Sequence, residues 1–493
     1  MNNKHFDQMK SYFKKLDEKF YFISPTNFNL IDMHNWIPGW LNINYINCFD
    51  NKSKQTLLPE EDLNRTFSSV EEINEYLISH PEVLKRLKTD SIKNKKGNVV
   101  FLFFNKNLED ICRKAKLNIF LPPNELVRNI DDKITTTEIG NSVGVDSVEN
   151  VLAKVDNFEH LMKLAKENKL GDKLVVQAPF GDSGKTTYFI NNSEEYKKYA
   201  KKIESEKKVK IMKLINCVGG AIEACATSEG TYVGPLLGEL IGFNEITPYK
   251  GGWCGNELYQ DQFSSDIRKQ VHLKTEVIGN ALYKRGYKGY FEVDFLIDLD
   301  NDKVYLGELN PRITGISAMT NLSPFCQNTV PLFFFHLLEY LNEKISISPK
   351  EFNQASLENG ATGVTSQLIV KSTHVELRKV ISSPASGIYK LNSNDEIELV
   401  QESSEPLDKS DLDDHAFLMR ILKENEFSYY GADRLILILN SKLTDAKGTK
   451  LNDNALKWIN AANNAFKTRE LTKEESIISK MYTSPASVKG ASV

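Results

Sequence analysis

Two runs of alternating apolar and polar residues, separated by a short polar turn, constrain the fold of this chain more than any other feature. The runs are YFEVDFLI and KVYLGELN, and DLDND lies between them. Side chains of a strand point to opposite faces in turn, so Glu292 and Asp294 share one face of the first run. Glu308 and Asn310 share one face of the second, with Arg312 next in phase. The pattern predicts a β-hairpin with an oxygen-rich, anionic face.

Asp294, Glu308 and Asn310 together offer the oxygen atoms that a hard cation prefers. Oxygen ligands with few protein contacts suit Mg²⁺ bridged to nucleotide phosphates, so we predict a magnesium site here. The alternative is that these side chains face water, which is usual for strand carboxylates. Gly307 before the acid and Pro311 after Asn310 argue against a plain solvated edge.

The stretch QAPFGDSGKTTYFI contains a glycine-rich turn followed by Lys185 and Thr186. It is not a P-loop, because Pro179 stands where that motif needs its first glycine and because β-branched and aromatic residues, typical of a strand, follow the turn. The pattern predicts two strands joined by a flap that folds over a triphosphate. An ordinary surface hairpin is the alternative. The flap would offer backbone N–H groups at Gly181 and Gly184, the Ser183 hydroxyl and the Lys185 charge.

The chain divides into three stretches by pattern, and we expect an α/β (α+β) fold. Residues 1–130 predict a small N-terminal α/β domain, in which Ser69 and Glu72 have capping-box spacing. Residues 131–345 mix strands and helices around the two motifs above, and residues 346–493 predict a C-terminal α/β domain. Within the second stretch, PYKGGWCGNELY predicts either a plain loop or a lid over a substrate.

Composition excludes several classes of function. The net charge is -4, with 62 basic and 66 acidic residues, so nothing favours nucleic acid as a partner. The longest apolar run, VPLFFFHLL, is about half a membrane span, so no membrane partner is expected. The polar first residues do not resemble a signal peptide. The six cysteines form no CxxC pair. We therefore expect a cytoplasmic protein without a zinc site.

The flap and the hairpin, in this order, resemble the ATP-grasp superfamily. The resemblance covers about residues 120–320 and continues more loosely to about 460. It implies an ATP-grasp fold with an N-terminal pre-grasp domain, and ATP and Mg²⁺ as cofactors. It also implies Asp294, Glu308 and Asn310 as metal ligands, with Glu308 bridging two ions. Arg312 would be the catalytic cation beside the transferred group.

Further ATP contacts follow from the same resemblance. Lys133, in NIDDKITTTEIG, would reach the nucleotide phosphates, and Lys213, in KIMKLIN, would lie near the adenine. Ordinary surface lysines are the alternative for both. Gln177 departs from the family, since many relatives have a lysine there, and a neutral amide adds no charge; Lys185 would compensate from the flap. The segment SQLIVKS resembles the C-terminal domain of biotin-carboxylase-like members.

The resemblance implies an ATP-dependent carboxylate–amine ligase that forms an amide or peptide-like bond through an acyl phosphate and releases ADP and phosphate. Its partners would be a small-molecule carboxylate, an amine and a second copy of the chain in a homodimer. One alternative is a biotin- or bicarbonate-dependent carboxylase, although no Ala-Met-Lys-Met carrier segment occurs. Another is a degenerate nucleotide-binding module, which only Gln177 favours.

Overall fold

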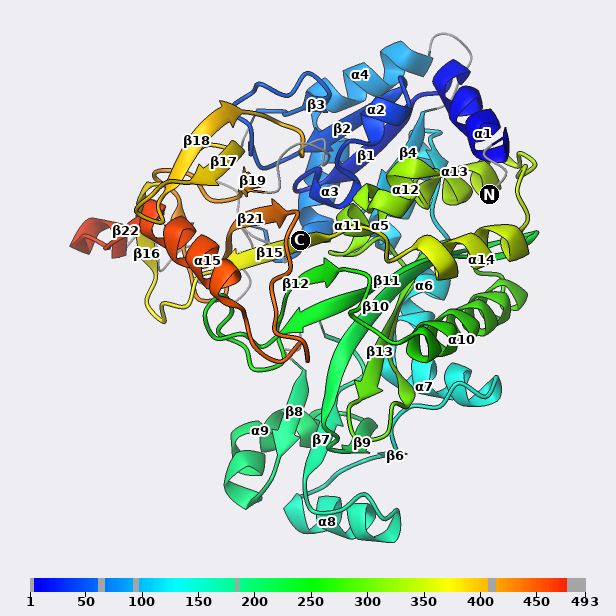
Figure 1. Cartoon of the computed structure of the whole chain (residues 1–493), viewed down its shortest axis with the longest axis vertical. Helices are drawn as coiled ribbons and strands as arrows, with labels where there is room; N and C mark the ends of the chain where they lie inside the picture. The colour runs from blue at the N-terminus through cyan, green and yellow to red at the C-terminus, as the bar shows by residue number, and fades with distance from the viewer. Residues whose placement is uncertain (1–3, 61–66, 92–96, 182–185, 407–413, 477–493) are drawn as a thin grey trace.

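The computed structural model describes residues 4–60, 67–91, 97–181, 186–406 and 414–476 (Figure 1). Over these residues the chain forms sheets of five, ten, three and four strands, with helices around them. The sheets include parallel and antiparallel pairs, so the predicted mixed α/β class is confirmed.

The N-terminal part is built on a parallel sheet of order β3-β2-β1-β4-β5. Helix α3 begins as the capping spacing predicts: the Ser69 side chain accepts a hydrogen bond from the Glu72 backbone N–H. The Glu72 carboxylate in turn accepts from the backbone N–H of Ser68. The elements are α1 (Lys4–Lys15), β1 (Phe20–Ser24), η1 (Phe28–Leu30), α2 (Met33–Trp36), β2 (Trp40–Asn44), β3 (Thr56–Leu57), α3 (Val70–Ser79), α4 (Pro81–Ser91), β4 (Asn98–Phe101), α5 (Lys106–Lys114), β5 (Asn118–Ile119), α6 (Asn124–Ile130) and α7 (Lys133–Ser142).

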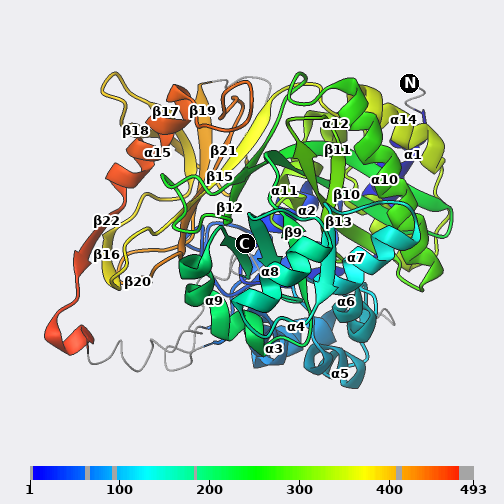
Figure 2. The ribbon, with the colours of Figure 1, turned by 90° about the horizontal axis from the view of Figure 1, so that it is seen from below.

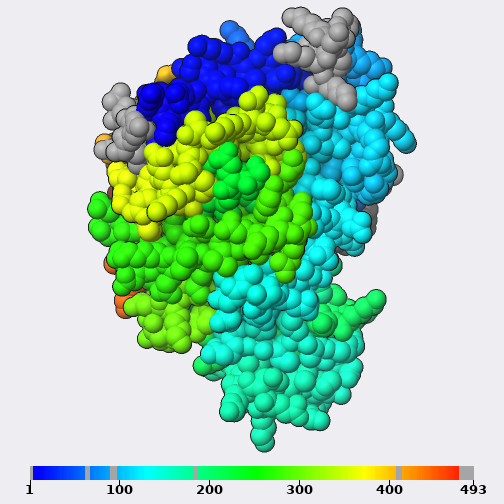
Figure 3. All heavy atoms as spheres, turned by 90° about the vertical axis from the view of Figure 1, so that its right-hand side faces the viewer, coloured from blue at the N-terminus to red at the C-terminus, as the bar shows by residue number. Residues whose placement is uncertain are grey.

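A small antiparallel sheet of order β6-β9-β7-β8 forms a lobe that projects from the rest of the molecule (Figures 1 and 3). Its strands and helices are β6 (Asn150–Ala153), α8 (Phe158–Glu167), β7 (Leu174–Gln177), β8 (Thr187–Ile190), α9 (Ser193–Ser205) and β9 (Val209–Lys213). The helices pack against one face of this sheet in a shared apolar core. Strands β7 and β8 pair antiparallel, which confirms the two predicted strands. The turn residues Ser183, Gly184 and Lys185 lie outside the described residues.

The ten-stranded sheet is the centre of the molecule and runs in the order β14-β13-β10-β11-β12-β15-β21-β19-β17-β18. This sheet contains strands from both sides of residue 345, so strands of the second and third stretches belong to one sheet. The strands are β10 (Cys217–Thr227), β11 (Gly230–Ile241), β12 (Trp253–Leu258), β13 (Gly289–Asp298), β14 (Val304–Asn310), β15 (Thr365–Lys371), β17 (Gly387–Leu391), β18 (Ile397–Glu402), β19 (His415–Arg420) and β21 (Asp433–Leu439). The domain boundaries at 130 and 345 stay predictions.

The predicted hairpin forms the β13–β14 edge of this sheet. Phe291, Val293 and Phe295 are fully buried on its apolar face and share a core with helix α10 (Ser265–Lys284). The glycine-rich segment, for which we expected a plain loop or a lid over a substrate, ends in a strand, because Gly255 lies inside β12. Its φ of 146° and the Gln367 carbonyl oxygen, which a Cβ at this position would overlap, explain why a glycine fits there.

The remaining elements cover the large sheet. A three-stranded sheet of order β20-β16-β22 completes the C-terminal part. Seen from the side of the small sheet, strands β17 to β19 and helix α15 lie far from α10 and α14 (Figure 2). These elements are α11 (Ser317–Leu322), α12 (Pro324–Asn328), α13 (Phe333–Leu341), α14 (Pro349–Asn359), β16 (Arg378–Ser382), β20 (Phe427–Ser428), α15 (Asp453–Ala465) and β22 (Lys467–Glu470). Among the described residues, no helix combines the length and apolar character needed to cross a membrane.

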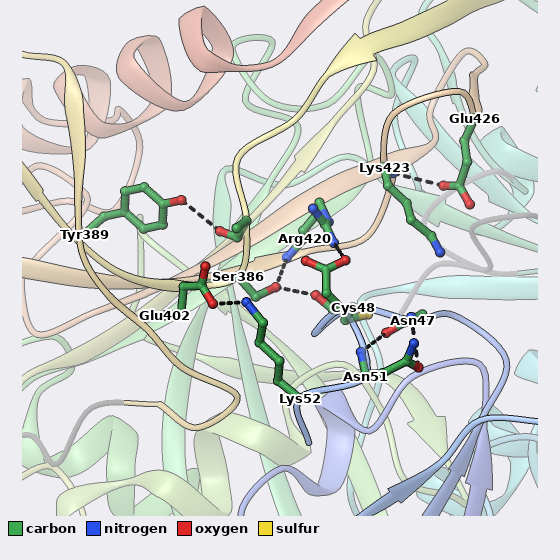
Figure 4. A network of polar contacts seen from close by, with 12 residues as sticks. Asn47, Cys48, Asn51, Lys52, Ser386, Tyr389, Glu402, Arg420, Lys423 and Glu426 are labelled. Atoms are coloured by element: carbon green, nitrogen blue, oxygen red, sulfur yellow. Dashed lines mark hydrogen bonds and ion pairs between the residues drawn. The ribbon is translucent and has the colours of Figure 1, made fainter. Parts of the chain in front are cut away.

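A polar network joins the N-terminal segment after β2 to the C-terminal strands (Figure 4). The Ser386 hydroxyl donates to the Cys48 carbonyl oxygen at 2.6 Å and accepts from the Arg420 backbone N–H at 2.9 Å. Arg420 also pairs with Asp50, and Lys52 pairs with Glu402. Segments more than 330 residues apart are therefore held together beside the large sheet.

One ion pair lies wholly inside the C-terminal part of the large sheet. Lys371 Nζ lies 2.6 Å from Asp433 Oδ1, and both side chains are at most 2% exposed. We predict that Lys371→Met lowers the free energy of unfolding by about 3–5 kcal/mol, because it leaves a buried carboxylate without its cation. The double variant Lys371→Met/Asp433→Leu should recover part of that loss. Urea denaturation measures both, and a double variant less stable than the single one would contradict this account.

Candidate functional site

A cavity of about 550 Å³ lies between the small sheet, the large sheet and the N-terminal part. All of the predicted site residues that the structure describes line this one cavity. They are Lys133, Gln177, Gly181, Lys213, Asp294, Glu308, Asn310 and Arg312. Ser183, Gly184 and Lys185 lie outside the described residues. The structure thus brings the two motifs together, while the role of each residue stays a prediction.

The register of the hairpin sets the acidic wall of the cavity. Asp294 on β13 lies opposite Glu308 on β14, and Glu292 lies opposite Asn310. All four line the cavity. The register shifts just beyond Asp294, where Gly307 is passed over. A Cβ at Gly307 would lie 2.9 Å from the Asp294 carbonyl oxygen, so the close approach of the two strands needs a glycine before Glu308.

Hydrogen bonds fix the predicted catalytic arginine against this wall. The Asn310 side-chain amide donates to Asp294 Oδ2 at 3.1 Å, and Arg312 Nη2 donates to Asn310 Oδ1 at 3.0 Å. The guanidinium also lies over the Phe103 ring, 4.8 Å from its centroid. Arg312 therefore lies beside the acidic residues in a set orientation, with a planar fork that suits carboxylate or phosphate groups.

Lys133 connects the flap to the hairpin. It is the first residue of α7, whose N-cap is Asp132. Its ammonium donates to Glu308 Oε1 at 2.7 Å and to the Gly181 carbonyl oxygen at 3.0 Å, and its side chain is only 3% exposed. The surface-lysine alternative is therefore wrong for Lys133. Lys213, by contrast, is exposed at the edge of the cavity.

Three carboxyl groups of the cavity ionise less readily than ordinary carboxyl groups. Burial, with Glu223 and Glu239 nearby, raises the pKa of Glu292 to about 8. Burial, with Glu292 and Glu308 nearby, raises the pKa of Asp294 well above its ordinary range. Burial, with Asp294 and Glu308 nearby, does the same to the pKa of Glu239. Like charges in a low dielectric disfavour ionisation.

These residues fit a divalent cation. The side chains of Asp294, Glu308 and Asn310 offer oxygen donors, as Mg²⁺ prefers. Asp294 Oδ1 is buried and makes no hydrogen bond with the described residues. A cation at this place would satisfy that oxygen and offset the repulsion that raises the carboxyl pKa values.

The opposite end of the cavity is apolar. Val148, Val175 and Met212 form a small cluster with Leu296 and Phe189 packed against it, and all five line the cavity. An apolar cleft between two sheets, with charged groups at one end, fits a planar ring joined to an anionic chain.

Gln177 lies between the two ends of the cavity. Its amide nitrogen donates to Thr187 Oγ1 at 3.3 Å. Its Oε1 is buried and accepts no hydrogen bond from the described residues. The amide is therefore held by the neighbouring strand, with one acceptor left for a ligand or water.

The segment that follows Arg312 is held by three distant parts of the chain. Asn29 donates to the Thr314 carbonyl oxygen at 2.7 Å, and Gln367 donates to the Gly315 carbonyl oxygen at 2.9 Å. Ser317, at the end of the segment, donates to the buried carboxylate of Glu223. The wall of the cavity next to Arg312 therefore depends on the N-terminal part, the large sheet and the C-terminal part together.

Sequence reasoning missed several residues of the site. Glu239 and Phe103 line the cavity but belong to none of the recognised motifs, whereas Trp253, which also lines it, lies in the glycine-rich segment PYKGGWCGNELY. The register of β10 with β11 and β13 is what brings Glu239 to the acidic wall, and the sequence contains no signal for that register. Glu292 did have a signal, since it shares the strand face of Asp294.

The raised pKa of Glu292 predicts a pH-dependent stability of the metal-free protein. Its pKa is 4.5 ordinarily and about 8 when folded, so the folded chain holds a proton that the unfolded chain releases. This contribution to stability is complete below pH 4.5 and is lost as the pH rises to about 8. Glu292→Gln should therefore lose less stability than the wild type between pH 5 and 9. Urea denaturation in EDTA measures this, and equal losses would contradict it.

Comparisons with known proteins agree with this architecture. No protein-family model matches the sequence. Biotin carboxylase 1 of Bacillus subtilis is 22% identical over 260 residues, which are 49% of this chain and 52% of that protein. The chain spans about half the length of the curated relatives it matches.

Solved structures match almost the whole chain. The biotin carboxylase of Campylobacter jejuni superposes with a TM-score of 0.58 at 12% identity, over 94% of this chain and 93% of that one. The phosphoribosylamine–glycine ligase of Thermotoga maritima does so with a TM-score of 0.54 at 13% identity, over 92% and 97%. The chain therefore has the ATP-grasp fold that its motifs implied, and the similarity to these structures extends over nearly its full length.

Proposed function

We propose that this chain is an ATP-dependent carboxylate–amine ligase that binds Mg·ATP in the cavity and forms an amide or peptide-like bond. One observation carries the proposal: a single cavity joins an apolar cleft, the oxygen donors of the β13–β14 hairpin and Arg312. The apolar cleft suits the adenine, and the hairpin suits the cation that accompanies the phosphates. The ligase from Thermotoga maritima, whose fold is similar, is named for joining an amine to glycine.

The proposed reaction has two steps. A carboxylate oxygen of the acid attacks the γ-phosphorus of ATP, which gives an acyl phosphate and ADP. The amine nitrogen then attacks the acyl carbon, its proton is released, and phosphate leaves. Such chemistry needs positioned reactants and offset charge more than a covalent nucleophile. Mg²⁺, when held by Asp294, Glu308 and Asn310, supplies positive charge at the phosphates.

The chain's own residues would orient and stabilise the reacting groups. Arg312, fixed by Asn310 and Phe103, would bind the substrate carboxylate and stabilise the oxyanion that develops at the acyl carbon. Lys133 would bind phosphate oxygens, since it already lies between the flap and Glu308. Gln177 would hydrogen-bond a phosphate oxygen without adding charge.

Carboxylation is the second candidate function. It is favoured by the similarity to biotin carboxylases, both along half of the sequence and over almost the whole fold. In that reaction bicarbonate would replace the organic acid. A homodimer is part of either proposal, supported by a similar structure that is described as a dimer of biotin carboxylase domains. A cytoplasmic location likewise stays a proposal.

We predict that Glu308→Gln lowers the rate of ADP release by about a hundredfold or more, because it removes a charged oxygen from the proposed cation site. The assay supplies Mg·ATP with a pool of organic acids and a pool of amines. Glu245→Gln is the control, because Glu245 is exposed and has the same charge. Its rate should match the wild type.

The substrates that ADP release requires distinguish the candidate functions. ADP release that needs both pools supports the ligase, and release that responds only to bicarbonate supports the carboxylase. An undiminished rate of ADP release by Glu308→Gln would contradict the proposed metal site. ATP binding without ADP release under every condition would instead favour a degenerate nucleotide-binding module.

A further inference from the structure

Three lysine side chains are buried among the described residues: Lys133, Lys210 and Lys371. Two have a carboxylate partner, at 2.7 Å for Lys133 and 2.6 Å for Lys371. Lys210 is 0% exposed, and no carboxylate of the described residues forms an ion pair with it. Within that part of the chain, its ammonium donates to the Ser147 hydroxyl alone, at 3.0 Å. A buried charge without an ionic partner is costly and rare, and it often marks a functional position.

Lys210 lies on the side of the small sheet that faces the cavity. On β9 it is directly opposite Gln177 on β7, and residues opposite each other on antiparallel strands project from the same face. Gln177 lines the cavity, as does Val148, the neighbour of Ser147. The next pair on this face, Val175 and Met212, also lines the cavity. Lys210 therefore lies just behind the cavity wall, on the same row as Gln177.

The charges around Lys210 belong to the phosphate end of the proposed site. Burial lowers the pKa of Lys210 to about 7, while Glu308 acts to raise this pKa and Lys133 to lower it further. Lys133 and Glu308 are bound to each other at 2.7 Å. Two lysines thus lie near one carboxylate of the hairpin, and that carboxylate forms its ion pair with Lys133.

We propose that Lys210 is a further cation of the nucleotide site, whose anionic partner is the polyphosphate of the bound nucleotide. This inference rests on the proposed function. A charge in the low dielectric of the interior acts over several Å, so Lys210 attracts the phosphates from behind the wall. Because Lys210 lies opposite Gln177 on the neighbouring strand, it also supplies the charge that the neutral amide of Gln177 lacks. Lys210 therefore increases the affinity of the site for nucleoside di- and triphosphates relative to its affinity for nucleosides.

The test compares nucleotides that differ in charge, on the whole chain and without relying on turnover. Isothermal titration calorimetry gives the Kd for ATP, ADP and adenosine. We expect Lys210→Met to weaken ATP and ADP binding by about tenfold and to change adenosine binding by less than about twofold. Lys207→Met is the matched control: Lys207 is exposed just before the same strand, so its loss removes one charge without affecting the site.

Thermal unfolding separates a functional lysine from a structural one. Lys210→Met removes a buried charge that has no ionic partner among the described residues, so its Tm should equal or exceed that of the wild type. If Lys210 only supported the fold, its replacement would instead lower the Tm and weaken the binding of all three ligands alike. Lys210→Gln, which keeps a hydrogen-bond donor for Ser147 but not the charge, should reproduce the loss of ATP affinity.

The outcomes distinguish this inference from the proposed function. If the wild type binds ATP and both Lys210 variants bind it equally well, the inference is overturned and the proposed function stands. If both variants fail to fold, Lys210 is structural and the inference is likewise overturned. If the wild type binds no ATP, the proposed function fails and the inference fails with it.

Discussion

The rest of this structure depends on carboxylates that lie directly opposite one another on neighbouring strands. Glu223 lies opposite Glu292, and Asp294 lies opposite Glu308, all on one face of the large sheet. Carboxylates so arranged repel one another, and burial makes the repulsion stronger. The chain offsets it only in part, with hydroxyl donors at Glu223 and the ammonium of Lys133 at Glu308. In the metal-free protein the raised pKa values of Glu292 and Asp294 favour protonation, which offsets the repulsion further. A bound metal–nucleotide complex would supply positive charge in place of those protons.

The whole chain contributes to holding that face in place. The hairpin belongs to the large sheet, Lys133 comes from the helix before the small sheet, and Gln177 and Lys210 come from the small sheet itself. The segment after Arg312 is anchored by Asn29 and by Gln367. The N-terminal and C-terminal parts, which supply these anchors, are also joined to each other by the Ser386 network (Figure 4).

The local features of the fold could be predicted from the sequence, but the registers between distant strands could not. Alternation alone predicted the β13–β14 hairpin and the shared face of Asp294, Glu308 and Asn310, because a two-residue period is a property of the strand itself. The flap arms followed from β-branched and aromatic residues. Gly255 was misjudged, because glycines usually indicate a loop and only the neighbouring Gln367 backbone explains a glycine inside β12. Glu239 and Lys210 were missed because their positions depend on which strands pair, and long-range pairing leaves no local pattern in the sequence.

The most direct test of the central claim is to locate the metal and the nucleotide. Mn²⁺ scatters anomalously and accepts the same oxygen ligands as Mg²⁺. In crystals grown with Mn²⁺ and ADP, we predict an anomalous peak in contact with Asp294 and Glu308, with the nucleotide base between the small and large sheets and its phosphates directed towards Lys133. An ordered nucleotide elsewhere, or a nucleotide in this cavity with no metal at the two carboxylates, would contradict the account.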